Sequence, residues 1–206
     1  MNKDFNNTNG FSYVDLGLPS GTLWATCNVG ADKPSDFGLY FQWGDIQGYT
    51  SEEVGLDEGQ KKFAIDWSDY KWGAAPNFTK YKRYGATLEL EDDAAHVNMG
   101  GDWHIPTPEQ CQELIDNTTS EWTTQDGVNG ELFTSKTDPS KSIFIPATGF
   151  AWNGSVYFRG SGGFVWSSML RSSSVCGGQG LRFGSDGAYL DINGRYGGFS
   201  VRGVIG

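Results

Sequence analysis

The chain is short of histidine and cysteine, the two residue types on which most zinc sites and much covalent catalysis depend. Its 206 residues include only two His, His96 and His104, and three Cys, Cys27, Cys111 and Cys176. It has no C-x-x-C pair, no His at metal-ligand spacing from a Cys, and no G-x-S-x-G nucleophile motif. We therefore expect no catalytic residues, a packing or hydrogen-bonding role for His104, and three separate thiols, with one disulfide as the alternative.

Long hydrophobic runs are also missing. No stretch of about 18 apolar residues occurs, so we expect no membrane insertion. Residues 1–10 are polar and rich in Asn, without the apolar core of a signal peptide. Export by the general secretory route is therefore not expected unless a leader has been removed. We interpret residues 1–10 as a loose N-terminal tail.

Lysine and glutamate are absent from the C-terminal third. All nine Lys and all nine Glu lie at or before Lys141, whereas residues 142–206 contain five Arg and only two acidic residues, Asp186 and Asp191. The net charge of −10 therefore arises from the rest of the chain. No basic run is interleaved with aromatic residues, and an acidic body repels phosphates. Nucleic acid is therefore not an expected partner.

Aromatic residues and glycine, by contrast, are abundant. The chain has eight Trp, nine Tyr, thirteen Phe and thirty Gly, which favours a loop-rich fold held together by aromatic rings over a helical bundle. A length of 206 residues suits one domain with a sizeable core. We predict a single α+β domain over residues 11–206, with short twisted antiparallel sheets, two helices and long irregular loops.

Turn and cap residues mark several elements. A Pro-Ser-Gly turn divides residues 13–25 into a hairpin. A short helix is predicted near residues 91–98, and a second begins at a Thr107 cap with Pro108 in its first turn and ends near Asn117. The other predicted elements are a strand at Phe37–Trp43, a long insertion packed down by its rings at 50–86, and strands at 142–146 and 164–168.

The composition of residues 171–206 is unusual, because Lys, Glu, Met, Trp, Thr, His and Pro are all missing from them. Gly, Ser and Arg dominate, with scattered Tyr, Asp and Asn. This mixture is similar to that of antibody paratopes, where small residues adapt while Tyr and Arg supply contact area. An ordinary loop region rich in Gly and Ser would have the same composition.

A strand is predicted within this segment. Alternate residues of a strand face opposite sides of its sheet. Leu181 and Phe183 are therefore predicted to face the core, and Arg182 and Gly184 to face outward. Residues 199–201 are expected to anchor a final strand in the same way, through Phe199 and Val201.

Several longer motifs resemble a known family. They are Tyr13–Ala31, Asp92–Ala95, Gly100–Thr107, Ile143–Phe150 and Trp166–Ser168. Together they span nearly the whole chain and resemble the Fibrobacter-type major paralogous domain of Bacteroidetes and their phages. The resemblance implies a C-type-lectin-like fold related to the formylglycine-generating enzymes. Those enzymes use a cysteine pair near the C-terminus, where this chain has only Cys176, so oxidase chemistry is not expected.

Residues 166–202 resemble the variable repeat of proteins that are targets of diversity-generating retroelements. These elements rewrite template adenines, mostly in AAC codons, and the resulting NNC codons cannot encode Lys, Glu, Gln, Met or Trp. Within residues 171–206 only Gln179 departs from this rule. The resemblance implies a variable ligand-binding segment at 164–202, built on a fixed framework.

The resemblance assigns many positions of this segment to one of two groups. The framework residues are Trp166, Ser167, Ser168, Leu170, Leu181, Phe183, Ser185, Arg195, Gly198, Phe199, Ser200, Val201 and Arg202. The outward-facing, ligand-binding residues are Arg171, Ser174, Cys176, Gly177, Gly180, Arg182, Gly184, Asp186, Gly187, Tyr189, Asp191, Asn193, Gly194, Tyr196 and Gly197.

By this resemblance the chain is a non-enzymatic receptor-binding or adhesin-like protein of a phage tail or a bacterial cell surface. Its implied partner is a protein or a glycan on a host or bacterial surface. The alternative is an ordinary surface lectin or structural domain without diversification, which could depend on calcium.

No cofactor is expected, although a structural calcium stays open, because calcium prefers clustered carboxylate and amide oxygens. Asp66, Asp69 and Asp92 are its candidate ligands. Residues 152–154, Trp-Asn-Gly, lack the acid found in the motifs of calcium-dependent lectins. Asp92 and Asp93 could act as paired carboxylates, but a solvated helix N-terminus explains them at least as well.

Overall fold

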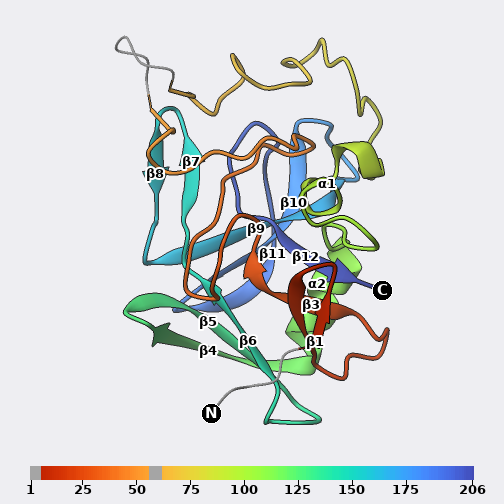
Figure 1. The fold of residues 1–206 in the computed structure, drawn as a ribbon. Coiled ribbons are helices and arrows are strands. Elements are labelled where there is room, and N and C mark those ends of the chain that lie inside the picture. Colours follow the sequence, from red (N-terminus) through yellow and green to blue (C-terminus); the bar gives the residue numbers. More distant parts are fainter. Residues whose placement is uncertain (1–5, 56–61) are drawn as a thin grey trace.

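The computed structural model describes residues 6–55 and 62–206, and they form the mixed helix and sheet structure that the composition predicts (Figure 1). The helical elements are a 3-10 turn η1 (Leu90–Asp92) and the helices α1 (Ala94–Met99) and α2 (Pro108–Asn117). The strands are β1 (Asn6–Thr8), β2 (Phe11–Asp15), β3 (Leu23–Asn28), β4 (Thr118–Gln125), β5 (Val128–Ser135), β6 (Ser142–Pro146), β7 (Phe150–Trp152), β8 (Ser155–Tyr157), β9 (Gly162–Leu170), β10 (Gly177–Gly184), β11 (Gly187–Gly194) and β12 (Arg202–Ile205).

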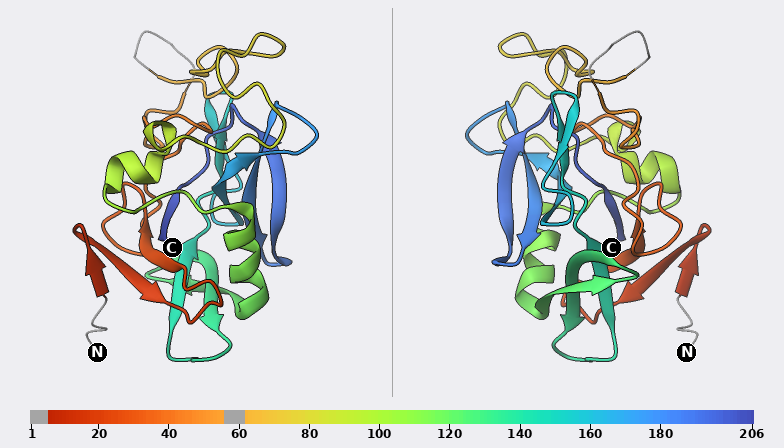
Figure 2. Two further views of the ribbon diagram at one scale, coloured as in Figure 1. Left: turned by 90° about the vertical axis from the view of Figure 1, so that its right-hand side faces the viewer. Right: turned by 90° about the vertical axis from the view of Figure 1, so that its left-hand side faces the viewer.

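These strands make four small antiparallel sheets, in the orders β1-β2-β3-β12, β4-β5-β6, β9-β10-β11 and β7-β8. The first sheet joins the two ends of the chain, because β12 pairs with β3. Helix α2 lies against β10 and β11, as the side views show (Figure 2). No helix in the described part of the chain has the length and hydropathy needed to cross a bilayer.

The two best-marked local predictions are confirmed. Strands β2 and β3 form the predicted hairpin, and the Gly21 amide donates to the Leu18 carbonyl in the turn between them, at 2.9 Å. Helix α2 begins at the Thr107 cap, whose hydroxyl accepts from the Gln110 amide while the Gln110 side chain accepts from the Thr107 amide. This reciprocal pair satisfies two amides that a helix start leaves free.

The predicted strand at Phe37–Trp43 is wrong. Gly38 has φ of 71°, a left-handed conformation that interrupts an extended chain. Beyond it, only single bridges form, between Tyr40 and Tyr49 and between Phe41 and Phe199. Tyr40, Phe41 and Trp43 are nevertheless buried. The run of aromatic residues therefore signalled burial and not strand geometry.

Both ends of the chain also depart from prediction. Asn6–Thr8 pairs with β2, so this part of the supposed tail is a strand, while residues 1–5 lie outside the described residues. Phe199 and Val201 are buried as expected. They precede the final strand, however, which begins at Arg202.

The long insertion at 50–86 is irregular and packed by its rings, as predicted, over its described residues. Trp67 lies at its centre, with its ring centroid 5.8 Å from that of Tyr70 and 5.6 Å from that of Phe78. The same Trp67 ring packs on Tyr196, near the C-terminus, at 4.4 Å. The insertion is thereby attached to the C-terminal segment.

The sheet β9-β10-β11 has one face turned to the core. Leu181 and Phe183 are buried there, as predicted, in a cluster with Leu114 of α2 and Phe133 of β5. The rings of Phe133 and Phe183 meet edge to face at 6.1 Å. This sheet is therefore supported from one side by α2 and by the sheet β4-β5-β6.

Arg202 ties the last strand to the centre of the molecule. Its guanidinium is buried and donates to the carbonyls of Ala25 (3.0 Å) and Phe144 (3.1 Å) and to the side-chain oxygen of Asn28 (2.9 Å). Burial lowers the pKa of Arg202 to about 10. One side chain thus holds β12, β3 and β6 together.

Glu131 on β5 is a buried carboxyl in apolar surroundings. It lies opposite Trp122 and Ile145 in the sheet, and both pack in the cluster that contains Phe183. Its Oε2 has no hydrogen-bond partner among the described residues. Burial raises the pKa of Glu131; a hydrogen bond with Ser120 opposes this effect, and the nearby acids of residues 186 and 121 add to it.

The two sides of the β10-β11 hairpin should differ in their tolerance of truncation. Phe183→Ala removes a buried ring and should lower the free energy of unfolding by about 3–5 kcal/mol. Tyr189→Ala, on the other strand and 38% exposed, should change it by no more than about 0.5 kcal/mol. Urea denaturation measures both, and equal losses would contradict the inside and outside assignment.

Glu131→Gln should alter how stability depends on pH. Because the pKa of Glu131 is higher in the folded than in the unfolded protein, its contribution is favourable at low pH and is lost as the pH rises above about 4.3. The variant avoids this loss, so its free energy of unfolding relative to the parent should increase as the pH rises above about 4.3. Parallel pH profiles for the two proteins would show that Glu131 does not carry this penalty.

Candidate ligand-binding surface

Burial within the segment 164–202 follows the implied framework closely. Every implied framework residue except Ser185 is buried, including Trp166, whose ring stacks on Phe199 at 4.1 Å, and the charged Arg195. Ser185 is exposed in the turn between β10 and β11, so its assignment to the interior is wrong.

Eleven of the residues implied to face outward are at least partly exposed, and four are not. The partly or fully exposed residues are Arg171, Ser174, Cys176, Arg182, Asp186, Gly187, Tyr189, Asp191, Asn193, Gly194 and Tyr196. The buried residues are Gly177, Gly180, Gly184 and Gly197, and for these the prediction of an outward-facing side is wrong.

Close backbone packing is the reason for these corrections. A Cβ atom at Gly180 would lie 2.5 Å from the Val165 carbonyl oxygen, and one at Gly177 would lie 2.7 Å from the Ile192 side chain. At Gly184 and Gly197 a backbone oxygen would lie 3.3 Å and 3.2 Å away. The simple alternation predicted for β10 therefore fails at Gly184, and these four positions have little room for an outward-facing side chain.

Arg182, Tyr189 and Asp191 form the centre of the exposed sheet face. Arg182 of β10 lies opposite Tyr189 of β11, with its guanidinium carbon 5.5 Å from the centre of the Tyr189 ring. The same group is 5.3 Å from the Phe164 ring, and its Nη1 is 3.4 Å from Asp191 Oδ2. The two side chains are 41% and 31% exposed, and an ion pair this exposed adds little stability.

Aromatic residues of the β7-β8 hairpin extend this face, and the sequence analysis did not identify them. Trp152 is 40% exposed, Tyr157 38% and Phe158 57%. Asn153 and Gly154 both have positive φ, at 46° and 72°, in the two-residue turn. An Asn-Gly pair between aromatic residues is a strong hairpin signal that could have revealed them.

A pocket of about 210 Å³ joins the hairpin to the C-terminal segment. Phe150 and Trp152 of β7 line one part of it, and Asn193, Gly194 and Tyr196 line another, together with the buried residues Gly197 and Phe199. The structure thus brings four of the implied ligand-binding residues, including the buried Gly197, together with two aromatic residues from outside the variable segment.

Other implied ligand-binding residues lie far from this pocket. In the register of β10 and β11, Gly177 pairs with Gly194 at one end and Gly184 with Gly187 at the other. Asp186 is in the turn at the second end, which is roughly 20 Å from the pocket end for strands of this length. The implied residues therefore cover a strip along the hairpin and not one cavity.

Arg195 fixes the backbone beside the pocket. Its guanidinium donates to the Tyr70 hydroxyl (2.6 Å) and to the carbonyls of Lys80, Tyr81 and Val175 (3.2, 3.1 and 3.1 Å). It also lies 4.3 Å from the centre of the Phe78 ring. The partly exposed neighbours of Arg195 thus project from a chain that is held on its inner side.

The candidate calcium ligands are engaged within the protein. Asp69 accepts hydrogen bonds from the amides of Ile65 and Asp66. Glu89, Glu91 and Asp92 bring carboxylate oxygens within 4.8 Å of one another. The ammonium of Lys80 already lies among them, 2.6 Å from both Glu89 and Asp92.

Asp92 and Asp93 are both buried, so the interpretation as a solvated helix N-terminus is wrong. Burial opposes ionisation of Asp92, but hydrogen bonds from Lys80, Tyr81 and Lys71 outweigh it and lower the pKa of Asp92. Asp93 caps α1 by accepting from the His96 amide, and it also accepts from the Ile105 amide. Each carboxylate has a structural role.

The thiols and imidazoles occupy separate places in the structure. Cys27, Cys111 and Cys176 are free thiols, as expected, and burial raises the pKa of Cys111 to about 12. His104 has the hydrogen-bonding role that was predicted, with its ring nitrogens 3.1 Å from the Ile105 carbonyl and 3.2 Å from that of Gly206.

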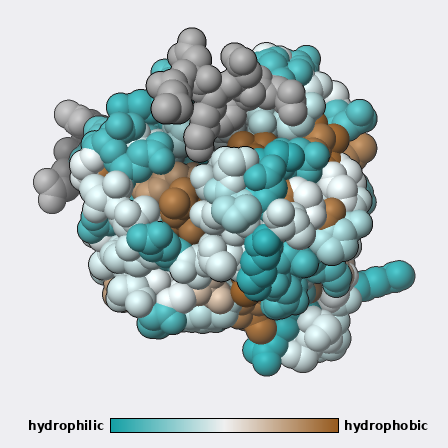
Figure 3. Space-filling view, turned by 90° about the horizontal axis from the view of Figure 1, so that it is seen from below, coloured by the Kyte–Doolittle hydropathy of each residue, from teal (hydrophilic) through white to brown (hydrophobic). Residues whose placement is uncertain are grey.

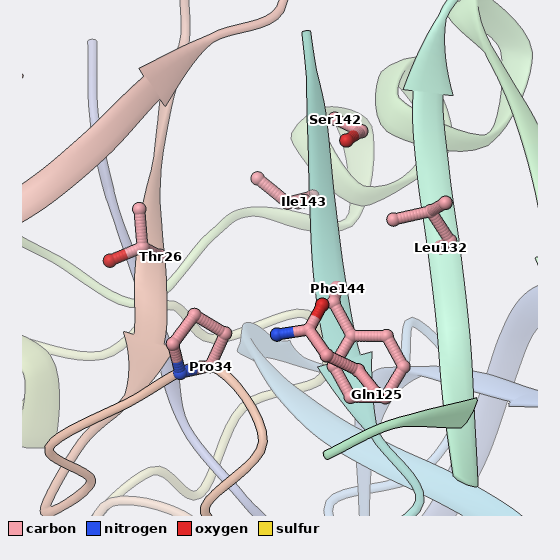
Figure 4. Close-up of a pocket in the computed structure, with 7 residues that line it drawn as sticks. All are labelled: Thr26, Pro34, Gln125, Leu132, Ser142, Ile143 and Phe144. Atoms are coloured by element: carbon pink, nitrogen blue, oxygen red, sulfur yellow. The ribbon is translucent and has the colours of Figure 1, made fainter. Parts of the chain in front are cut away.

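A second pocket, of about 220 Å³, contains none of the implied ligand-binding residues. Figure 4 shows it between β3 and β6, with Thr26 and Pro34 on one side and Ile143 and Phe144 on the other. On the face of the molecule seen from below, hydrophobic residues lie in small separate patches among hydrophilic ones (Figure 3). Because the second pocket contains none of the implied residues, the strip along β10 and β11, with the adjoining pocket at β7, is the stronger candidate.

Comparison with known proteins gave no match to a family model, a curated protein or a solved structure.

Removing the Arg195 guanidinium should loosen the insertion and the pocket together. Arg195→Ala removes the donor from two buried acceptors, the Tyr81 carbonyl and the Tyr70 hydroxyl, and from two partly buried carbonyls. Each buried loss costs about 1–3 kcal/mol, so we expect a loss of at least about 3 kcal/mol in unfolding free energy. Hydrogen exchange should rise first in residues 66–83 and 193–197. The matched control Arg83→Ala, at an exposed side chain, should change stability by at most about 0.5 kcal/mol. An equal effect in both variants would contradict the role given to Arg195.

Proposed function

We propose that this chain is a non-enzymatic ligand-binding protein of the C-type-lectin-like fold, whose C-terminal segment is diversified by a retroelement. The observation that carries the proposal is the division of residues 164–202 into a buried framework and a partly exposed strip. Variation at the strip leaves the hydrophobic core untouched, because the core side chains of β10 point to the opposite side. The composition of residues 171–206 supports the same proposal, because every residue except Gln179 can be encoded by an NNC codon.

The proposed ligand is a protein or a glycan on a host or bacterial surface. Trp, Tyr and Arg are the residue types that contribute most at binding surfaces, and Trp152, Tyr189 and Arg182 are all accessible. As a receptor-binding protein or adhesin, the chain would act on a phage tail or on a bacterial cell surface. Its binding would not require calcium, since Lys80 neutralises the best-formed acidic cluster.

The second candidate function is that of a surface lectin or structural domain without diversification. The four buried glycines of the implied ligand-binding set favour it, because a randomised codon at Gly180 would usually introduce a side chain that collides with β9. The two candidates predict different flanking DNA, because only the first requires the genes of a retroelement.

The flanking DNA decides between them. Diversification requires a reverse-transcriptase gene and a second, nearly identical copy of the segment encoding residues 164–202. We expect the two copies to differ mainly at codons for exposed residues such as Arg182, Tyr189 and Asp191, and to agree at codons for Trp166 and Phe183. Sequencing the locus tests this directly. A locus that lacks either the reverse-transcriptase gene or the second copy would leave only the second candidate.

A further inference from the structure

The pocket between β7 and the C-terminal segment has aromatic walls that are held in place from behind. Phe150 stacks on Tyr157 with centroids 5.6 Å apart, and Trp152 lies 5.9 Å from the same ring. On the other side, Trp67 packs against Tyr196 at 4.4 Å. The Trp152 side chain still keeps 40% of its surface exposed. The pocket therefore presents a preformed aromatic surface to the solvent.

The pocket is electrically neutral. None of its seven described lining residues carries a charge. The charged residues Arg182 and Asp191, on the strip along the β10-β11 hairpin, are paired with each other, with Arg182 Nη1 3.4 Å from Asp191 Oδ2. The Asn193 amide nitrogen lies 3.4 Å from the same carboxylate, so Asp191 is engaged on two sides. A ligand group that depends on an ion pair would find no free partner in this pocket.

Its size limits what can enter. A volume of about 210 Å³ is below the range of about 300–1,000 Å³ typical of sites for drug-sized molecules. One six-membered ring fills such a space, whereas a longer ligand would continue along the surface. Aromatic walls, an amide side chain and glycine backbone together match a ring that has one apolar face and a polar edge.

We propose that this pocket binds one pyranose ring of a neutral glycan, without calcium. The C–H bonds on the apolar face of the sugar would lie against Trp152, because the face of an aromatic ring is partly negative. The sugar hydroxyls would meet the Asn193 amide and the backbone of residues 194–197. This inference rests on the proposed function only in taking the β7-β10-β11 face as the one that meets the ligand.

The position of the two walls has a consequence for specificity. Phe150 and Trp152 lie outside the implied variable segment, whereas Asn193, Gly194 and Tyr196 lie within it. The stacking wall would therefore be the same in every variant, and the hydrogen-bonding wall would change. Different variants would recognise neutral sugars that differ in their hydroxyl pattern or their linkage.

The test is a titration of the whole chain with a panel of methyl glycosides of neutral hexoses and N-acetylhexosamines, in buffer containing EDTA. Tryptophan fluorescence and saturation-transfer NMR report binding. We expect at least one glycoside to bind, Trp152→Ala to weaken that binding by about tenfold or more, and Trp152→Phe to retain most of it. Asn193→Ala should weaken binding too. Tyr84→Ala, at an aromatic side chain that is 66% exposed elsewhere, is the matched control and should have no effect.

The inference is overturned if no glycoside binds, if Trp152→Ala binds as the parent does, or if EDTA abolishes binding. Thermal unfolding of each variant distinguishes a loss of binding from a loss of folding. If Trp152→Ala does not fold, Trp152→Phe, which keeps an aromatic ring, still tests the role of this side chain. Failure of sugar binding while purified host surface proteins still bind would leave the proposed function standing. Sugar binding by a chain whose locus lacks the repeat and the reverse transcriptase would retain this inference and remove diversification.

Discussion

Two buried guanidinium groups hold the C-terminal segment to the rest of the molecule. Arg195 and Arg202 are fully buried, and neither forms an ion pair within residues 6–55 and 62–206. Their donors are satisfied mainly by backbone carbonyls from distant parts of the chain. A buried charge is costly unless its hydrogen bonds are made, so these contacts strongly favour one backbone path. If one of the segments that supply these carbonyls moved away, the guanidinium would remain buried without its hydrogen bonds.

This constraint gives a physical basis for the proposal that a fixed backbone carries variable side chains. The Arg195 amide donates to the Cys176 carbonyl, and the Arg195 carbonyl accepts from the Trp43 amide. The residues on either side of Arg195 are therefore positioned by main-chain bonds and by the buried guanidinium, whatever their own side chains are. On β10 and β11 the support comes instead from packing of the opposite face against α2 and β5. The implied binding residues and the residues that stabilise the fold are thus largely separate.

The sequence predicted well where local chemistry decides the structure. The Thr107 cap set the start of α2, and the burial of Trp166, Leu181 and Phe183 followed from pattern and resemblance. Prediction failed where long-range packing decides. The burial of Gly180 depends on the closeness of β9, and the pocket depends on a β7-β8 hairpin that lies outside the segment singled out by composition. The hydrophobic pattern of one segment does not show how closely a distant segment packs against it.

The central claim is that the exposed strip tolerates almost any side chain. Its most direct test is a library of about twenty random clones whose codons are changed to NNC at Arg171, Ser174, Asp186, Tyr189, Asp191 and Asn193. A parallel library would change the buried Gly177, Gly180, Gly184 and Gly197. Thermal unfolding should place most clones of the first library within about 5 °C of the parent, and clones of the second far below it. Melting temperatures that fall as far in the first library as in the second would contradict the account.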